Sequence, residues 1–131
     1  MSKTGLAKDR DALTDQVIGL AIGVHRALGP GLLESAYEEC LCFELKSHEI
    51  PFKRQVPLPV SYKSVYLECG YRVDVVVADR LILELKTVEK ILPIHEAQLL
   101  TYLKLSGIRT GLLLNFYTTL LKDGIKRMVL S

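Results

Sequence analysis

The 131-residue sequence lacks the features that mark several large classes of protein. Its apolar stretches are far shorter than the roughly 20 residues needed to cross a bilayer, which argues against a transmembrane helix. Cys40, Cys42 and Cys69 contain no CxxC pair, so they fit neither a zinc knuckle nor a disulfide framework. The polar amino-terminal segment has no apolar run of the kind found in signal peptides. We therefore expect a cytoplasmic protein without membrane contact.

The charge of the chain points to no particular partner. The sequence has 17 Lys and Arg against 15 Asp and Glu, a formal net charge of +2. A nearly balanced charge does not identify a nucleic-acid-binding protein, although a fold can still gather basic residues on one side. The composition is that of a globular protein, and the length fits a single domain over residues 1–131, of which the polar residues 1–12 are expected to be loosely ordered.

Apolar spacing predicts three helices. The first extends from Leu13 to Leu28 and is interrupted by Gly29-Pro30-Gly31, which disfavours continued helix. The second runs from about Leu32 to Ser47, and the third from Ile94 to Leu105, with Gly107 as its stop. The core-facing residues expected in the first helix are Leu13, Val17, Leu20, Val24 and Leu28.

Strand patterns occupy the remaining segments. Phe52 to Tyr62 carries prolines at alternate positions, which is typical of an edge strand. Further strands are expected at 65–67 and 71–78, at 81–86, at 109–116 and at 125–130. Strands 71–78 and 81–86 should form a hairpin, with Tyr71, Val73, Val75 and Val77 on one face. The order α-α-β-β-β-α-β-β predicts an α/β or α+β fold with helices flanking a mixed β-sheet.

Several polar residues fall where apolar neighbours surround them: Glu34, Asp74, Glu84, Lys86, Gln98 and Tyr102. Each has an ordinary structural explanation, such as a first-turn glutamate stabilised by the helix dipole, a surface ion pair or an i,i+4 helix pair. For His95 we expect a capping or core-edge role ahead of a metal or acid–base role. The combined order and spacing of the polar residues favour a common site over unrelated coincidences.

The chemistry of this set suits phosphodiester hydrolysis. Asp74, Glu84 and Glu34 offer the hard oxygen ligands that Mg²⁺ or Mn²⁺ prefers, and the backbone carbonyl of Leu85 can add another. A neighbouring Lys86 would orient a water molecule, accept its proton or stabilise negative charge. Gln98 and Tyr102, on one helix face, would hydrogen-bond the phosphate or brace the other side chains.

Motifs for other chemistries are missing from the sequence. It contains no nucleophile elbow, P-loop or Gly-rich dinucleotide turn, and its three histidines do not have the spacing of a zinc peptidase.

The segment Gly31-Leu32-Leu33-Glu34-Ser35-Ala36-Tyr37 matches the pattern GxxExxY. With it, the chain resembles the GxxExxY proteins, small members of the PD-(D/E)XK nuclease superfamily, from roughly Val17 to Leu130. Further matching segments are 29–31, 55–60, 70–74, 83–86 and 95–102.

The resemblance implies the α-β-β-β-α-β core of that superfamily and a role for each matching residue. Glu34 resembles the helix glutamate that completes the metal shell. Asp74 resembles the metal-binding aspartate, although no proline precedes it here. Glu84 and Lys86 resemble the (D/E)xK pair.

Gln98 and Tyr102 resemble the QxxxY helix of the exonuclease-like branch of the superfamily. Together these matches imply an Mg²⁺- or Mn²⁺-dependent nuclease acting on nucleic acid, with DNA favoured over RNA, in repair, recombination or defence. An RNA-directed nuclease and a catalytically silent nucleic-acid-binding or protein-assembly module stay open as alternatives. The small size favours a homo-oligomer or a partner protein that supplies further surface for gripping substrate.

Overall fold

The computed structural model describes residues 11–131. Most of the segment expected to be loosely ordered, residues 1–10, lies outside the described residues. Asp11 is the N-cap of helix α2 (Ala12–Leu28), and Ala12 is the first residue of that helix. The Asp11 carboxylate accepts the Thr14 N–H at 2.7 Å and so caps the helix.

The two amino-terminal helices pack against each other and meet at a sharp loop. Helix α2 ends at Leu28 and is capped by Gly29, whose φ of 76° a residue with a side chain adopts only with strain. Helix α3 (Glu34–Ser47) follows. The buried residues of α2 are Thr14, Val17, Ala21, Val24 and His25. The predicted stripe is therefore partly wrong: Leu28 is 38% exposed, while the His25 side chain faces inward, with Nε2 3.1 Å from the Phe116 carbonyl oxygen.

A five-stranded mixed sheet forms the centre of the fold, with strand order β1-β4-β5-β6-β7. Strands β5 and β6 are parallel and are joined through helix α4 (Pro93–Ser106), whereas the other neighbours are antiparallel. The 3-10 helix η1 (Leu121–Gly124) precedes the last strand. The strands are β1 (Phe52–Pro57), β4 (Arg72–Val77), β5 (Leu81–Lys86), β6 (Thr110–Asn115) and β7 (Ile125–Val129).

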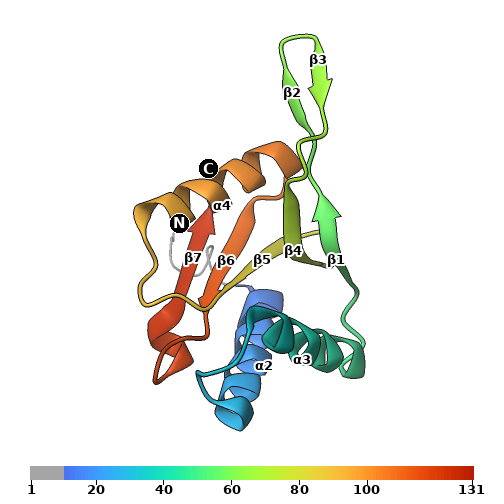
Figure 1. Cartoon of the computed structure of the whole chain (residues 1–131). Coiled ribbons are helices and arrows are strands. Elements are labelled where there is room, and N and C mark those ends of the chain that lie inside the picture. Colours follow the sequence, from blue (N-terminus) through green and yellow to red (C-terminus); the bar gives the residue numbers. More distant parts are fainter. Residues whose placement is uncertain (1–10) are drawn as a thin grey trace, which may run out of the picture.

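Helices cover both faces of the sheet, α2 and α3 on one side and α4 on the other (Figure 1). Leu83 and Leu112 pack toward α2 and α3, while Ile82 and Leu113 pack toward Leu99 of α4. This arrangement confirms the predicted fold class and the prediction that residues 109–116 form a strand covered on both faces. Within residues 11–131, no helix is both long and apolar enough to cross a membrane.

The predicted strand from Phe52 to Tyr62 is wrong as a single element. It divides into the edge strand β1 and the short strand β2 (Val60–Tyr62), which pairs with β3 (Val65–Leu67). Pro57 is the last residue of β1 and Pro59 lies between the strands, where neither needs to donate to a ladder. The β2–β3 hairpin projects from the body of the molecule, and the order becomes α-α-β-β-β-β-β-α-β-β (Figure 1).

Strand β4 changes face at Asp74, which contradicts the predicted alternation. Val75 belongs to the core beneath α2 and α3, but Val73 packs on the α4 side. The β4–β5 ladder pairs Val75 with Leu83 and does not continue to Asp74. On the neighbouring β1, Gln55 adopts a φ of 51°, opposite the same point of β4. The regular pleat is interrupted in both strands where the ladder ends.

Gly111 of β6 allows close approach of α4, since a Cβ there would lie 2.8 Å from Leu99 Cδ1. We expect Gly111→Ala to destabilise the fold by about 1–3 kcal/mol because the buried Leu99 must shift. Gly19→Ala, in the exposed middle of α2 with open space around it, should stabilise by about 0.5–1 kcal/mol. Urea unfolding of both variants measures the two changes in the free energy of unfolding. Equal effects of the same sign would contradict the packing described.

Candidate functional site

Asp74 and Glu84 replace the missing ladder hydrogen bonds with bonds from their side chains. The Asp74 N–H donates to Glu84 Oε2 at 2.8 Å, and the Leu85 N–H donates to Asp74 Oδ2 at 2.8 Å. Each strand thus satisfies a backbone donor of the other through a carboxylate. The strands are held together at the point where they would otherwise separate, and the two carboxylates are fixed beside each other.

The exchange uses only one oxygen of each carboxylate. Among the described residues, no hydrogen bond uses the second carboxylate oxygen of Asp74 or of Glu84. The Lys86 carbonyl accepts the Phe116 N–H at 2.8 Å, on the β6 side of β5. Because N–H and C=O of one strand residue point to the same side, the Leu85 carbonyl faces the Asp74 side, like its N–H. Three oxygen atoms therefore remain for a ligand.

Burial shifts both carboxyl groups toward their neutral forms, and the Asp74 charge adds to the shift of Glu84. Burial, followed by the neighbouring Asp74 charge, raises the pKa of Glu84 to about 8. Burial also raises the pKa of Asp74, against the Leu85 N–H bond, which favours its charged form. Without a cation, the pair resists carrying two negative charges. A bound cation would remove this resistance.

Lys86, Gln98 and Tyr102 belong to the α4 side of the sheet. Lys86 is half-buried and lies two residues beyond Glu84 on the same face of β5. Gln98 Nε2 donates to the Tyr102 hydroxyl at 3.1 Å, as their i,i+4 spacing predicts. The pKa of the buried Tyr102 is raised by burial and next by the Glu84 charge, so the helix pair lies within the field of the carboxylates.

Glu34 lies near the end of β5 but not in the carboxylate pair. It is the first residue of α3, and its Oε2 accepts the Thr87 N–H at 3.1 Å. The helix start is held by the buried Tyr37, whose hydroxyl donates to the Gly29 carbonyl and accepts the Leu32 N–H at 3.0 Å. The Tyr37 ring also stacks on Phe116 at 4.4 Å between centroids. The tyrosine of the GxxExxY pattern therefore fixes the loop that presents Glu34.

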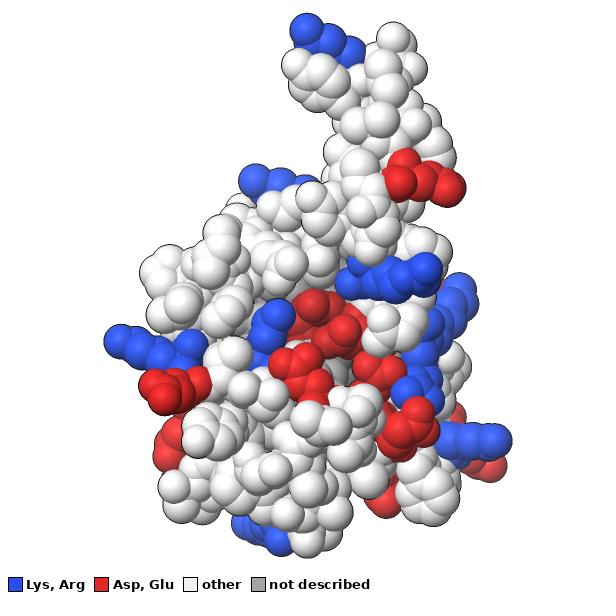
Figure 2. Space-filling model, viewed as in Figure 1, with Lys and Arg blue, Asp and Glu red and all other residues white. Residues whose placement is uncertain are grey.

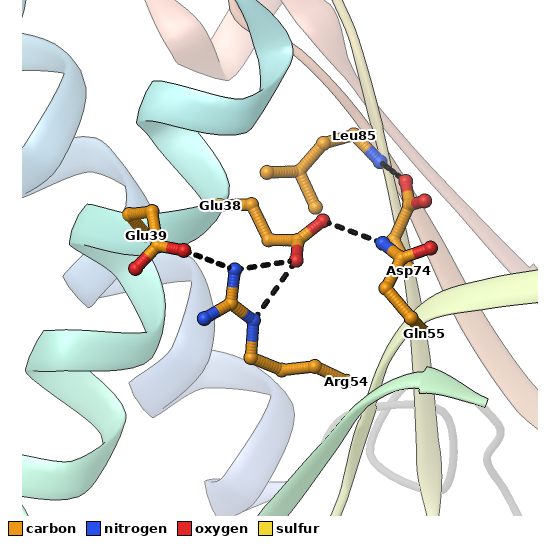
Figure 3. Close-up of polar contacts among 6 residues, drawn as sticks. All are labelled: Glu38, Glu39, Arg54, Gln55, Asp74 and Leu85. Atoms are coloured by element: carbon orange, nitrogen blue, oxygen red, sulfur yellow. Dashed lines mark hydrogen bonds and ion pairs between the residues drawn. The ribbon is translucent and has the colours of Figure 1, made fainter.

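Sequence reasoning missed Glu38, which lies one helical turn after Glu34 and is only 8% exposed. Its Oε1 accepts Gln55 Nε2 at 2.9 Å and its Oε2 accepts Arg54 Nε at 2.9 Å (Figure 3). Arg54 also bonds Glu39 at 2.6 Å, which anchors the cluster on α3. The i+4 spacing from Glu34 was the available signal, because it puts both glutamates on the same face of α3.

The acidic side chains gather in the middle of one face, below the projecting hairpin, with Lys and Arg side chains beside them (Figure 2). The charges of Glu34 and Glu38 both raise the pKa of Asp74, whereas that of Lys86 lowers it. This local balance is negative even though the whole chain is slightly positive. A polyanion would approach this face only with a cation present or through the surrounding basic residues.

The fit to a divalent cation is partial in this arrangement. Within residues 11–131, no group of three or more His, Cys, Asp or Glu side chains lies close enough to hold an ion. The Asp74–Glu84 pair offers hard oxygen donors of the right chemistry, with a free oxygen on each. Glu34 bonds Thr87 instead. As expected from the sequence, His95 is a cap: its Nδ1 accepts the Leu92 N–H at 2.9 Å.

A family model described as the PD-(D/E)XK nuclease superfamily matches residues 11–128. The chain belongs to the PD-(D/E)XK nuclease superfamily. Membership in its GxxExxY group stays a prediction. No curated protein and no solved structure matches the chain.

Glu84 gives a test of the site that requires no substrate. Because its pKa is raised from 4.5 to about 8, the folded protein binds this proton more tightly than the unfolded chain. The stabilisation is complete below about pH 4.5 and is lost as the pH rises through about 8. The Glu84→Gln variant has no carboxyl group at this position and so does not lose this stabilisation. With a chelator present, its free energy of unfolding should therefore rise relative to that of the wild type as the pH increases from about 5 to about 8.5. A pH-independent difference would contradict the assignment.

Proposed function

We propose that the chain is a divalent-metal-dependent nuclease that hydrolyses phosphodiester bonds, with DNA as the favoured substrate. The observation that carries this proposal is the Asp74–Glu84 exchange. Where the β4–β5 ladder ends, this exchange holds two carboxylates together, and each of them has an oxygen without a hydrogen bond from any described residue. Superfamily membership supports the class of reaction. We further propose that the chain, 1–131, is one domain that works in the cytoplasm, in repair, recombination or defence.

Asp74, Glu84 and the Leu85 carbonyl would hold the Mg²⁺ or Mn²⁺ ion in this proposal. A bound ion of this kind polarises the phosphate and makes its water more acidic. Glu34 would complete the shell. Its side chain is exposed at the start of α3, so it can leave Thr87 by rotation about its own bonds.

The remaining side chains would act on the substrate directly. The Lys86 ammonium would donate hydrogen bonds to the attacking water and to the phosphate oxygens, and as an amine it would accept the proton of the water. The Tyr102 hydroxyl already accepts from Gln98, which leaves its own hydrogen to donate to a phosphate oxygen. A homo-oligomer or a partner protein would extend the surface that grips the strand.

The test is a cleavage assay on single- and double-stranded DNA and RNA with Mg²⁺ or Mn²⁺. We expect Asp74→Asn and Lys86→Ala each to reduce the rate at least about 100-fold, since each removes a group that acts on the reacting atoms. Asp79→Asn is the matched control, because Asp79 is an exposed aspartate in the β4–β5 turn. Circular dichroism should show that all variants are folded. Wild-type protein that leaves every substrate intact would contradict the proposal, as would an Asp74→Asn variant of wild-type activity.

A catalytically silent module for nucleic-acid binding or protein assembly is the second candidate. It is favoured by the incomplete ligand set within the described residues. Thermal melting distinguishes the two, because a ligand at 100 times its dissociation constant stabilises by about 2.7 kcal/mol. Nucleic-acid binding without any stabilisation by Mn²⁺ would favour the module over the enzyme.

A further inference from the structure

The Gln98–Tyr102 pair of the candidate site also borders a pocket. It lies between α4 and the base of the β2–β3 hairpin and has a volume of about 480 Å³, within the range of small-molecule sites. We call it the α4–hairpin pocket. It is lined by Val60, Tyr71, Ile94, His95, Gln98, Thr101, Tyr102 and Leu105.

The pocket adjoins the candidate active site through Tyr102. This residue lines the pocket together with its partner Gln98, and it also lies in the field of Glu84 and Asp74. A nucleotide whose phosphate reaches the carboxylates would therefore have its neighbouring sugar and base at the pocket mouth. An apolar peptide would match the apolar part of the lining, but it has no phosphate that could bind at the neighbouring phosphodiester site.

The chemistry of the lining suits a nucleobase. Tyr71 is 46% exposed and its ring lies 6.5 Å from that of Tyr102, with 58° between the planes, so two aromatic surfaces border the same space. His95 accepts the Leu92 N–H through Nδ1, which places the hydrogen of its neutral ring on Nε2 as a donor. Together with Gln98 and Thr101, it offers hydrogen-bond partners for the edge of a base held on the aromatic rings.

The backbone that carries the Tyr71 ring, directly before β4, is held in place by its neighbours. The carbonyl of Tyr71 accepts the Leu58 N–H at 2.8 Å, and Leu58 is itself buried beside α4. Gly70, with a φ of 82°, makes the bend that turns the chain from the hairpin into this position. A fixed backbone at this position reduces the freedom that the chain loses when a base stacks on the Tyr71 ring.

We propose that the α4–hairpin pocket binds an unpaired nucleobase next to the cleaved phosphate, and that the substrate is single-stranded DNA or a single-stranded end. A paired base cannot enter, because its edge and both faces are occupied within a duplex. That the carboxylate pair cleaves a phosphodiester rests on the proposed function, but the pocket can bind a base without cleavage.

Two measurements test the proposal. With chelator present, fluorescence anisotropy of a labelled 15-mer of single-stranded DNA reports binding alone. Tyr71→Ala should weaken this binding about 5- to 150-fold, the usual contribution of one stacked base, while Tyr71→Phe keeps it. Phe43→Ala is the matched control, since Phe43 is an aromatic residue 67% exposed on α3, outside the pocket. With Mn²⁺, wild type should cleave the single strand at least about tenfold faster than the same sequence in a duplex.

An abasic site in the 15-mer gives an independent check. Removing the base beside the cleaved bond should slow wild-type cleavage there by a factor similar to that of Tyr71→Ala, and the two losses should not multiply, because they remove the same contact. If Tyr71→Ala binds and cleaves like wild type, the pocket inference fails while the nuclease proposal stands. If single-stranded DNA binds through Tyr71 but is never cleaved, the pocket stands and the nuclease proposal fails.

Discussion

The exchange of backbone amides for carboxylates between β4 and β5 is the interaction on which the candidate site depends. A regular ladder would have directed the Asp74 and Leu85 N–H groups at carbonyl oxygens, leaving no space between the strands. Here Glu84 and Asp74 accept those donors instead, at 2.8 Å each. The carboxylates are thereby buried close together, at an energetic cost visible in the raised pKa values of both groups. A cation bound between them would relieve that cost.

The other elements hold their side chains around this break in the sheet. The stacked Tyr37 ring fixes the loop before α3, so that the helix starts at Glu34, close to the end of β5. Helix α4 crosses the opposite face and is packed closely onto β6 at Gly111. The same helix brings Tyr102 to the carboxylates and to the α4–hairpin pocket, which links the chemistry to the proposed choice of substrate.

Local periodicity was sufficient to predict the helices and the central strands, because these elements follow the burial of their own side chains. It identified Glu84 and Lys86 on one face and the Gln98–Tyr102 bond. It failed at Asp74, since a change of face arises from contacts with β1 and β5 that no single-strand pattern contains. The contacts of Glu38 were missed for the same reason, since Arg54 and Gln55 lie on β1, a different element. The projecting hairpin pairs residues close in sequence, but the prediction ran a single strand from Phe52 to Tyr62 across the break at Pro59.

The most direct test of the carboxylate pair as a cation site is a Mn²⁺ titration followed by amide NMR spectra. The amides of Asp74 and Leu85 donate to the two carboxylates themselves, so they are the probes nearest to a bound paramagnetic ion. We expect these two signals to broaden first in the wild-type protein and to stay sharp at the same concentrations in Asp74→Asn. Broadening that begins elsewhere, or that is unchanged in Asp74→Asn, would show that the carboxylate pair is not the cation site.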